Sequence, residues 1–365
     1  MTLPLVQDSF AGSPRNSGED FVFLACQQGT EPTIKQQLIQ LHTPLKLAFS
    51  RPGLLTFKIF RSDRSEVIEL PRHPLLRQTG WVLGQVRGDS AENLVRETAV
   101  IGQSGWDAVH VFQRDPVLPG ERGYEPGRSA LCDEIGLMLK QQMGGTTAIN
   151  QICRSGERIM DLVVVEPNHW IIGYHRACEN DPLTCWPGGA YCVPPPPGMI
   201  SRAYLKMAEA INWSRLPVAS GDSIVEIGCA PGGSSQRLLD MGLKVTGIDP
   251  AEMDPVLLDH PSFTHWRGKA AAIKRRKYQH FRWLTADANV APNYTLDFVE
   301  DIVSYPTTRL QGLLLTLKLS SYDLIDQLPV YKNRVRNWGF QRVEARQLAH
   351  NRRELFLVAE RNSSA

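Results

Sequence analysis

The chain has 365 residues, of which 42% are hydrophobic and 21% are charged, and its formal net charge is +2. These values are typical of an ordinary soluble globular protein with two or three domains. The longest apolar run, Leu313 to Leu319, is interrupted by Thr316 and Lys318, which excludes a membrane-spanning segment there.

The cysteines and the N-terminus indicate a cytoplasmic protein. Seven cysteines, an odd number without a C-x-x-C pair, favour reduced thiols. No basic segment followed by an apolar one opens the chain, so we expect no secretory signal. Cys178, Cys185 and Cys192 recur every seven residues, but this spacing matches no standard zinc module. The sequence therefore predicts no metal site.

Two small α+β units are predicted in the first part of the chain. For residues 1–75 the apolar patterns predict strands at Phe21 to Ala25, Lys46 to Ser50 and Leu54 to Phe60, and a helix from Thr30 to about Leu41. For residues 76–177 they predict strands at Trp81 to Val86 and Ala108 to Phe112, helices at Ser90 to Ile101 and Ser129 to Met143, and a hairpin of Met160 to Glu166 with Trp170 to His175.

A proline-rich stretch separates these units from the rest. Residues 178–198 contain Pro182, Pro187 and the run Pro194 to Pro197, which indicates a stiff linker. Strands and helices alternate from residue 199 to residue 365. This alternation predicts a doubly wound α/β sheet with an antiparallel pair of strands at its end. We expect one of the intervening helices at Ala270 to Arg276.

A glycine-rich turn opens this last region. The apolar run Ile224 to Ile227 predicts a buried strand, Gly228 ends it, and a helix follows the turn. Such a turn brings backbone N–H groups and a helix N-terminus to a polar ligand at the carboxyl end of the sheet. The cofactor-binding residues predicted in this turn are Gly228, Ala230, Pro231, Gly232 and Gly233.

The next predicted strand ends at Asp249, about 20 residues past the first glycine, where a carboxylate can accept both hydroxyls of a ribose. Two cofactors fit this pattern. A dinucleotide such as NAD needs G-x-G-x-x-G, whereas Ala230 and Pro231 stand in the corresponding turn here. A turn that contains proline has fewer free N–H groups, which favours a nucleoside with an amino-acid tail. We therefore expect S-adenosylmethionine rather than NAD.

Four ionisable residues fall near the expected ligand site. Lys206 lies on the predicted helix before the glycine turn, Asp287 and Lys318 follow apolar strands, and Glu354 opens the last strand. Because the carboxyl ends of strands surround the ligand in a doubly wound sheet, we expect these groups to converge. A lysine at the end of an apolar strand, near a second cation, should have a lowered pKa and act as general base, although carboxylates beside it would limit that shift.

The motifs of the last region resemble the FtsJ-like ribose 2′-O-methyltransferases. They are S-R-A-Y-L-K (Ser201 to Lys206), G-C-A-P-G-G (Gly228 to Gly233), the acid Asp249, A-D (Ala286 and Asp287), L-K-L (Leu317 to Leu319) and Glu354. That family has a Lys-Asp-Lys-Glu tetrad. The resemblance implies S-adenosylmethionine as cofactor, with Asp287 also near it, and a catalytic tetrad of Lys206, Asp287, Lys318 as general base and Glu354.

Within this family the chain is most similar to the RlmM-type enzymes, which methylate a cytidine ribose of 23S ribosomal RNA. The pattern A-R-Q-L-x-H-x-R-x-E at Ala345 to Glu354 is similar to theirs. The resemblance implies that the chain binds RNA, and 23S ribosomal RNA is the species expected. It also implies a ferredoxin-like domain at residues 1–75 and a THUMP-like RNA-binding domain at residues 76–177. Lys269 stands where these enzymes have an Asp near the adenine.

Two other functions remain open from the sequence. One is a non-catalytic RNA-binding protein that retains the methyltransferase fold, and the other is a nicotinamide-dependent oxidoreductase. The basic run Lys274 to Lys277 fits contacts with RNA phosphates, and it equally fits a solvated helix end. The sequence does not indicate an oligomeric state.

Overall fold

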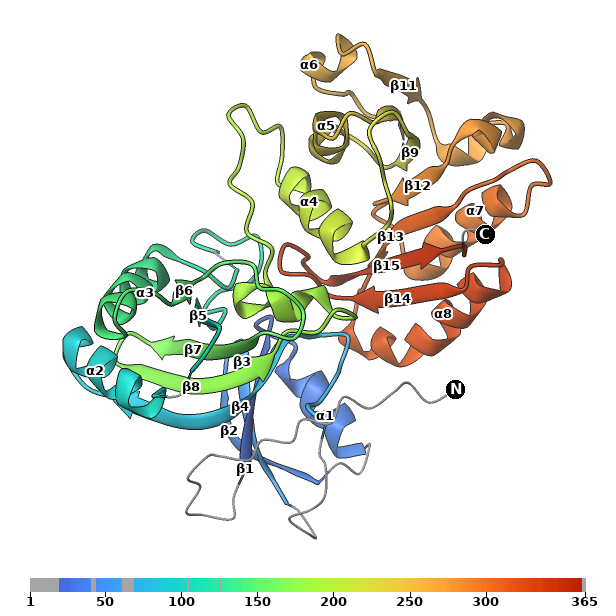
Figure 1. The fold of residues 1–365 in the computed structure, drawn as a ribbon. Helices are drawn as coiled ribbons and strands as arrows, with labels where there is room; N and C mark the ends of the chain where they lie inside the picture. The colour runs from blue at the N-terminus through green and yellow to red at the C-terminus, as the bar shows by residue number, and fades with distance from the viewer. Residues whose placement is uncertain (1–19, 41–43, 61–68, 104, 125, 363–365) are drawn as a thin grey trace.

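The structure is a computed structural model that describes residues 20–40, 44–60, 69–103, 105–124 and 126–362. Two β-sheets dominate these residues (Figure 1): one in the blue-to-green part of the chain and one in the yellow-to-red part. Leu41, the predicted end of the first helix, lies outside the described residues. Across the described ranges, no helix combines the length and the apolar character that crossing a bilayer requires.

The first sheet has eight strands in the order β2-β3-β1-β4-β8-β7-β5-β6. The strands are β1 (Asp20–Cys26), β2 (Leu45–Arg51), β3 (Leu54–Ile59), β4 (Leu76–Arg87), β5 (Ala108–Gln113), β6 (Ala148–Ile149), β7 (Arg158–Glu166) and β8 (His169–Arg176). Because β4 pairs with β1 on one side and with β8 on the other, strands from both predicted α+β units form one continuous sheet. The ferredoxin-like and THUMP-like identities of residues 1–75 and 76–177 stay predictions.

Three helices accompany this sheet, α1 (Glu31–Gln40), α2 (Ala91–Ile101) and α3 (Ala130–Gln142). The N-terminus of α2 is capped by Ser90, whose hydroxyl accepts a hydrogen bond from the backbone N–H of Asn93. Leu94 of α2 and Ile135 of α3 are buried in one core with the β-strands. The predicted helices and the β7–β8 hairpin are confirmed in this part of the chain.

The second sheet has seven strands in the order β11-β10-β9-β12-β13-β15-β14. The strands are β9 (Ser223–Ile227), β10 (Lys244–Asp249), β11 (Phe263–Arg267), β12 (Trp283–Ala286), β13 (Gly312–Lys318), β14 (Arg342–Arg346) and β15 (Glu354–Glu360). Strands β9 to β13 pair in parallel, and β15 is antiparallel to both of its neighbours. The predicted doubly wound sheet with a terminal antiparallel pair is confirmed.

Helices cover both faces of this sheet because its strands alternate their buried side chains between two cores. Ile224 packs in one core with α4 and α5, whereas its neighbour Val225 packs in the other with α7 and α8. The helices of this region are α4 (Ala203–Ser214), α5 (Gly233–Asp240), α6 (Pro255–Leu258), α7 (Pro292–Val303) and α8 (Leu328–Asn337). The chain order reverses between β9 and β12, so the carboxyl ends of these two strands form the switch point where ligands bind in such sheets.

The predicted helix at Ala270 to Arg276 is wrong. The chain forms two short 3₁₀ turns there, at residues 270–272 and 275–280, separated by extended backbone at Ile273 and Lys274. The guanidinium of Arg275 donates hydrogen bonds to the carbonyl oxygens of Ala270 and Ile273. The carbonyl oxygen of Ala270 also accepts the N–H of Ile273 at 3.1 Å, in the bonding of a 3₁₀ turn rather than that of a continuous α-helix.

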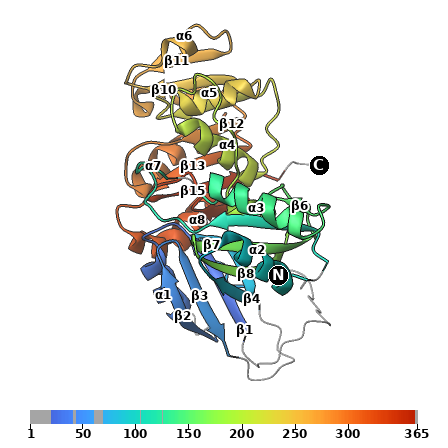
Figure 2. The ribbon, with the colours of Figure 1, turned by 90° about the vertical axis from the view of Figure 1, so that its left-hand side faces the viewer.

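The two sheets are packed against each other (Figure 2). One apolar cluster joins Val22 of β1 and Ile34 of α1 to Leu319, Leu328 and Leu355 of the second region. The predicted linker contributes to the contact as well: its residues Leu183 and Trp186 are buried in the core that contains α4. The first half of the proline-rich stretch is therefore a packed segment of the fold.

Candidate functional site

The four ionisable residues singled out in the sequence lie together at the carboxyl edge of the second sheet. Lys206 projects from α4, Asp287 directly follows β12, Lys318 ends β13 and Glu354 begins β15. Lys318 and Glu354 are direct cross-strand partners in the β13–β15 register. Lys206 and Asp287, which lie 81 positions apart in the sequence, meet here, as the expected convergence required.

The four charged groups form a closed ring in which ammonium groups and carboxylates alternate. Nζ of Lys206 lies 2.6 Å from Oδ2 of Asp287 and 2.5 Å from Oε1 of Glu354. Nζ of Lys318 lies 2.8 Å from Oδ1 of Asp287 and 2.5 Å from Oε2 of Glu354. Each carboxylate thus uses one oxygen for each lysine, and each lysine bridges both carboxylates.

The ring has a buried side and an open side. The side chains of Lys206 and Glu354 are 11% and 6% exposed, whereas those of Lys318 and Asp287 are 27% and 28% exposed. Nζ of Lys206 also lies 5.4 Å from the ring centre of Phe356, within the range of a cation–π contact. An incoming molecule therefore meets Lys318 and Asp287 first.

The pKa of Lys318 differs from the prediction. Burial on its own would lower this pKa, but the carboxylates of Asp287 and Glu354 outweigh burial and raise the pKa above the ordinary lysine value. The predicted fall is therefore wrong for this arrangement. Burial likewise favours neutral carboxyls, yet the lysines hold the pKa values of Asp287 and Glu354 below their ordinary range. All the groups whose pKa is shifted in the ring favour their charged forms.

The segment that precedes Glu354 is fixed by a buried carboxylate that sequence reasoning did not single out. Glu209, on α4 one turn beyond Lys206, accepts hydrogen bonds from the backbone N–H groups of Ala349 at 3.0 Å and His350 at 2.9 Å. Its Oε2 also lies 3.1 Å from Nδ1 of His350. The same helix thus carries one member of the ring and anchors the segment that leads to another. In the sequence, the feature that could have pointed to Glu209 is its position one helical turn after Lys206.

The predicted glycine turn lies beside this ring. A Cβ atom added at Gly228 would lie 2.6 Å from the carbonyl oxygen of Asp287, and Gly228 has a φ of +80°. Only glycine therefore lets the turn approach the ring so closely. Gly232, with a φ of +122°, is the N-cap of α5, and no side chain caps this helix. The first N–H groups of α5 are consequently open to a ligand.

The other predicted cofactor residues lie in or against the turn. Asp249 ends β10 and accepts a hydrogen bond from the backbone N–H of Ala230 at 3.2 Å and from that of Ala251 at 2.8 Å. Pro231 follows Ala230, and a Cβ atom on Gly233 would lie 2.2 Å from Oγ of Ser201. The strand-end carboxylate therefore braces the turn and keeps free acceptor capacity, since each oxygen has more than one lone pair.

A second carboxyl lies beneath the turn. Glu226 of β9 is buried, and its Oε2 accepts a hydrogen bond of 2.5 Å from the hydroxyl of Ser235 on α5. Burial raises the pKa of Glu226 to about 7. The neighbouring hydroxyl of Ser234 is also buried, and hydrogen bonding from Ser235 and Ser234 partly offsets the effect of burial on this pKa. The uncapped N-terminus of α5 is the feature expected where a polar ligand binds.

These donors and acceptors suit a nucleoside with an amino-acid tail. The N–H groups at the start of α5 can bind a carboxylate, and Asp249 can accept from ribose hydroxyls. Lys269 follows β11 beside this site, where Gly268 donates its N–H to the carbonyl oxygen of Asp249 at 3.1 Å. Of the basic run, Arg275 is paired with Asp301 at 3.2 Å, and Nζ of Lys277 lies 4.7 Å from the ring centre of Trp266.

Residues 199–317 match the family model of FtsJ-like methyltransferases. The chain is 30% identical over 188 residues to ribosomal RNA large subunit methyltransferase M of Halorhodospira halophila, which covers 50% of this chain and 53% of that protein. It is 23% identical over 233 residues to the protein of the same name from Pseudoalteromonas translucida, covering 61% of this chain and 63% of that protein. The first of these matches spans about half the length of the relative.

Among solved structures, TrmN from Thermus thermophilus has a TM-score of 0.34 at 10% identity, over 93% of this chain and 99% of that one. This similarity is too low to support an argument about fold or function. The order of the strands, the ion ring and the family match of residues 199–317 are the features that bear on the function of the chain.

Proposed function

We propose that the chain transfers a methyl group from S-adenosylmethionine to the 2′-hydroxyl of an RNA ribose, because residues 199–317 match the family model of FtsJ-like methyltransferases. The observation that carries this proposal is the ring of Lys206, Asp287, Lys318 and Glu354 beside the glycine turn. Removing four charged groups from water costs folding free energy, and apolar side chains could fill the same space without that cost. A purely structural role therefore does not account for the ring.

Lys318 is the proposed general base. A ribose hydroxyl must lose its proton as its oxygen is methylated, and the Nζ of Lys318 lies on the more exposed side of the ring. Asp287 and Glu354 hold this Nζ in place at 2.8 and 2.5 Å, and Lys206 fixes the same two carboxylates from the buried side. Bound S-adenosylmethionine supplies a methyl group that is already electrophilic.

The proposed cofactor site is the turn of Gly228, Ala230, Pro231, Gly232 and Gly233 with Asp249 and Asp287. The start of α5 would bind the carboxylate of the cofactor, and Asp249 would accept from its ribose. The names of the relatives favour large-subunit ribosomal RNA as the substrate, and 23S RNA is the species we propose. We further propose that residues 76–177 bind this RNA as a THUMP-like unit.

The test is methyl transfer from labelled S-adenosylmethionine to total RNA, followed by mapping of the labelled nucleotide. We expect Lys318→Ala to lower the rate by about 100-fold or more, the usual range for loss of a general base. Lys244→Ala is the matched control, since Lys244 is an exposed lysine at the opposite end of β10. Isothermal titration should show that both variants bind S-adenosylmethionine and that neither binds NAD.

Two results would contradict the proposal. If Lys318→Ala still binds the cofactor and methylates RNA at an unchanged rate, Lys318 is not the general base. RNA retention without any cofactor-dependent turnover by the unmodified chain would favour the non-catalytic RNA-binding alternative.

A further inference from the structure

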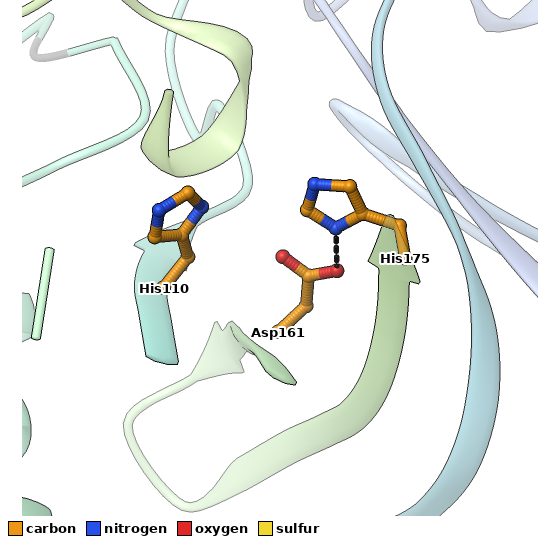
Figure 3. Close-up of side chains that lie close together, drawn as sticks. All are labelled: His110, Asp161 and His175. Carbon is orange, nitrogen blue, oxygen red and sulfur yellow. Dashed lines mark hydrogen bonds and ion pairs between the residues drawn. The ribbon is translucent and has the colours of Figure 1, made fainter. Parts of the chain in front are cut away.

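Three side chains with metal-binding atoms meet inside the first sheet region (Figure 3). They are His110 on β5, Asp161 on β7 and His175 on β8, and all three are buried. His110 and Asp161 are direct partners in the parallel β5–β7 register. His175 pairs with Ile159, two residues before Asp161, and therefore shares the same face of the sheet. One potential ligand atom from each residue lies within 4.8 Å of the others.

The hydrogen bonds of the two imidazoles fix which nitrogen faces the centre. Nε2 of His110 lies 3.0 Å from the carbonyl oxygen of Gln151, and Nε2 of His175 lies 2.7 Å from that of Thr184. A carbonyl oxygen only accepts, so each Nε2 carries the hydrogen. The Nδ1 atoms are the ones left for other partners. Figure 3 shows a ring nitrogen of each histidine directed toward the carboxyl group of Asp161.

Two atoms at the centre of this cluster are unsatisfied. Nδ1 of His175 lies 2.6 Å from Oδ2 of Asp161, so these two atoms are paired. Nδ1 of His110 and Oδ1 of Asp161 are buried and have no hydrogen-bond partner among the described residues. A buried His–Asp pair alone explains the first contact and leaves the other two atoms unexplained. Unpaired buried polar atoms are costly and rare in folded proteins.

We propose that this cluster binds one divalent transition-metal ion of the zinc class, through Nδ1 of His110, Nδ1 of His175 and the carboxylate of Asp161. Two imidazoles and one carboxylate suit zinc or cobalt, whereas magnesium and calcium prefer oxygen ligands. Each histidine donates its other N–H to a backbone carbonyl, which is the usual arrangement behind a metal-bound imidazole. The ion satisfies both unpaired atoms at once.

The ligand set contains no thiolate. The sulfur of Cys153 lies 3.2 Å from Nε2 of His110, the nitrogen that is turned away from the metal position. Cys185 packs beside Cys153, and its carbonyl oxygen accepts the N–H of Cys153 at 2.9 Å, but its sulfur is not in the group of potential metal ligands. The ion would link strands β5, β7 and β8, and its two imidazole ligands are held from behind by the carbonyl oxygens of Gln151 and Thr184.

The first experiment titrates cobalt(II) into the metal-free full chain and follows the visible and near-ultraviolet absorbance. We expect saturation at one ion per chain, with visible bands of a cobalt site that has nitrogen and oxygen ligands and without a thiolate charge-transfer band. Zinc should displace the cobalt and raise the melting temperature of the chain, because a ligand that binds only the folded state stabilises it. Absence of saturable binding, or a thiolate band, would overturn the proposal.

The second experiment assigns the ligands by substitution. Asp161→Asn and His175→Gln should each weaken cobalt binding about tenfold or more. Two matched controls should leave the affinity unchanged: His169→Gln on the same strand β8, and Cys185→Ser beside the cluster. The circular dichroism of each variant verifies the fold. Cobalt binding that survives both ligand substitutions in folded protein would place the ion elsewhere and refute the assignment.

Discussion

The side-chain amide of Gln27 donates a hydrogen bond of 2.6 Å to the carbonyl oxygen of Asn351, three residues before Glu354. The same amide nitrogen lies 3.3 Å from the carbonyl oxygen of Leu348 and 3.4 Å from that of Ala349. Gln27 directly follows β1 of the first sheet. The segment that leads to the ion ring is therefore supported by the N-terminal part of the chain on one side and by Glu209 on the other.

Gln27→Ala should lower the methylation rate without changing the affinity for S-adenosylmethionine. The substitution leaves buried carbonyl oxygens without their donor, which costs about 1–3 kcal/mol of folding stability, and it frees the segment before Glu354. Single-turnover kinetics and isothermal titration separate the two quantities. The control is Gln36→Ala on the exposed side of α1. Equal rates for both variants would show that the contact does not position the ring.

Glu209→Gln should reduce the maximal rate more than the apparent affinity for RNA. An amide NH₂ cannot accept the N–H groups of Ala349 and His350 that one carboxylate now accepts together. We expect a loss of about 1–3 kcal/mol in unfolding free energy together with the lower rate. Glu209→Asp keeps the acceptors on a shorter stem and should restore part of the rate. A similar loss in both variants would indicate a merely structural role.

The methylation rate should rise with pH through the neutral range. A general base acts in its unprotonated form, and the pKa of Lys318 lies above the ordinary lysine value because Asp287 and Glu354 outweigh burial. The unprotonated fraction, and with it the rate, should increase about tenfold per pH unit between about pH 7 and pH 9. Single-turnover rates with saturating cofactor measure this dependence. A flat profile would contradict the assignment of Lys318 as base.

Glu226→Gln should stabilise the fold at high pH relative to low pH. The pKa of Glu226 is raised from 4.5 to about 7 by burial, so the folded state holds a proton that the unfolded state releases. Stability is therefore lost as the pH rises from 4.5 through 7, by about 3 kcal/mol at most, and glutamine does not lose it. Urea unfolding at about pH 5 and pH 8 measures the difference. Glu252→Gln, at an exposed glutamate, should show none.

Gly228→Ala should abolish methylation and cofactor binding together. Its added Cβ would lie 2.6 Å from the carbonyl oxygen of Asp287, in addition to the strain of a positive φ. Gly221→Ala is the matched control: its φ of +87° is similar, but a Cβ there meets nothing within 4 Å. Only the first variant should lose activity, and the difference isolates the steric effect from backbone strain. Equal losses would show that strain alone is responsible.

Local pattern and sheet topology explain what the sequence could predict. Lys318 and Asp287 each follow an apolar strand, and the rule that ligands gather at carboxyl strand ends places them together. The pKa of Lys318 could not be predicted, because it depends on distances of 2.8 and 2.5 Å to two carboxylates that only folding brings there. The roles of Gln27 and Glu209 were hidden for a similar reason, since their partners lie more than 100 residues away.

The histidine cluster illustrates the same limit. His110, Asp161 and His175 come from three strands, and no local spacing of the kind found in zinc modules connects them. The cysteines at seven-residue intervals were the more conspicuous pattern in the sequence. Sheet register, which a single sequence does not reveal, places His110 opposite Asp161 and brings His175 to the same face.

The apolar cluster of Val22, Ile34, Leu319, Leu328 and Leu355 has a mechanical consequence. A core shared by both sheets resists hinge motion between them, because any rotation would open apolar surface to water. When RNA is bound to the N-terminal part, this packing also fixes the distance between the bound RNA and Lys318. Only a nucleotide at that distance from the bound RNA element could then reach Lys318, so the fixed packing would select the methylated position.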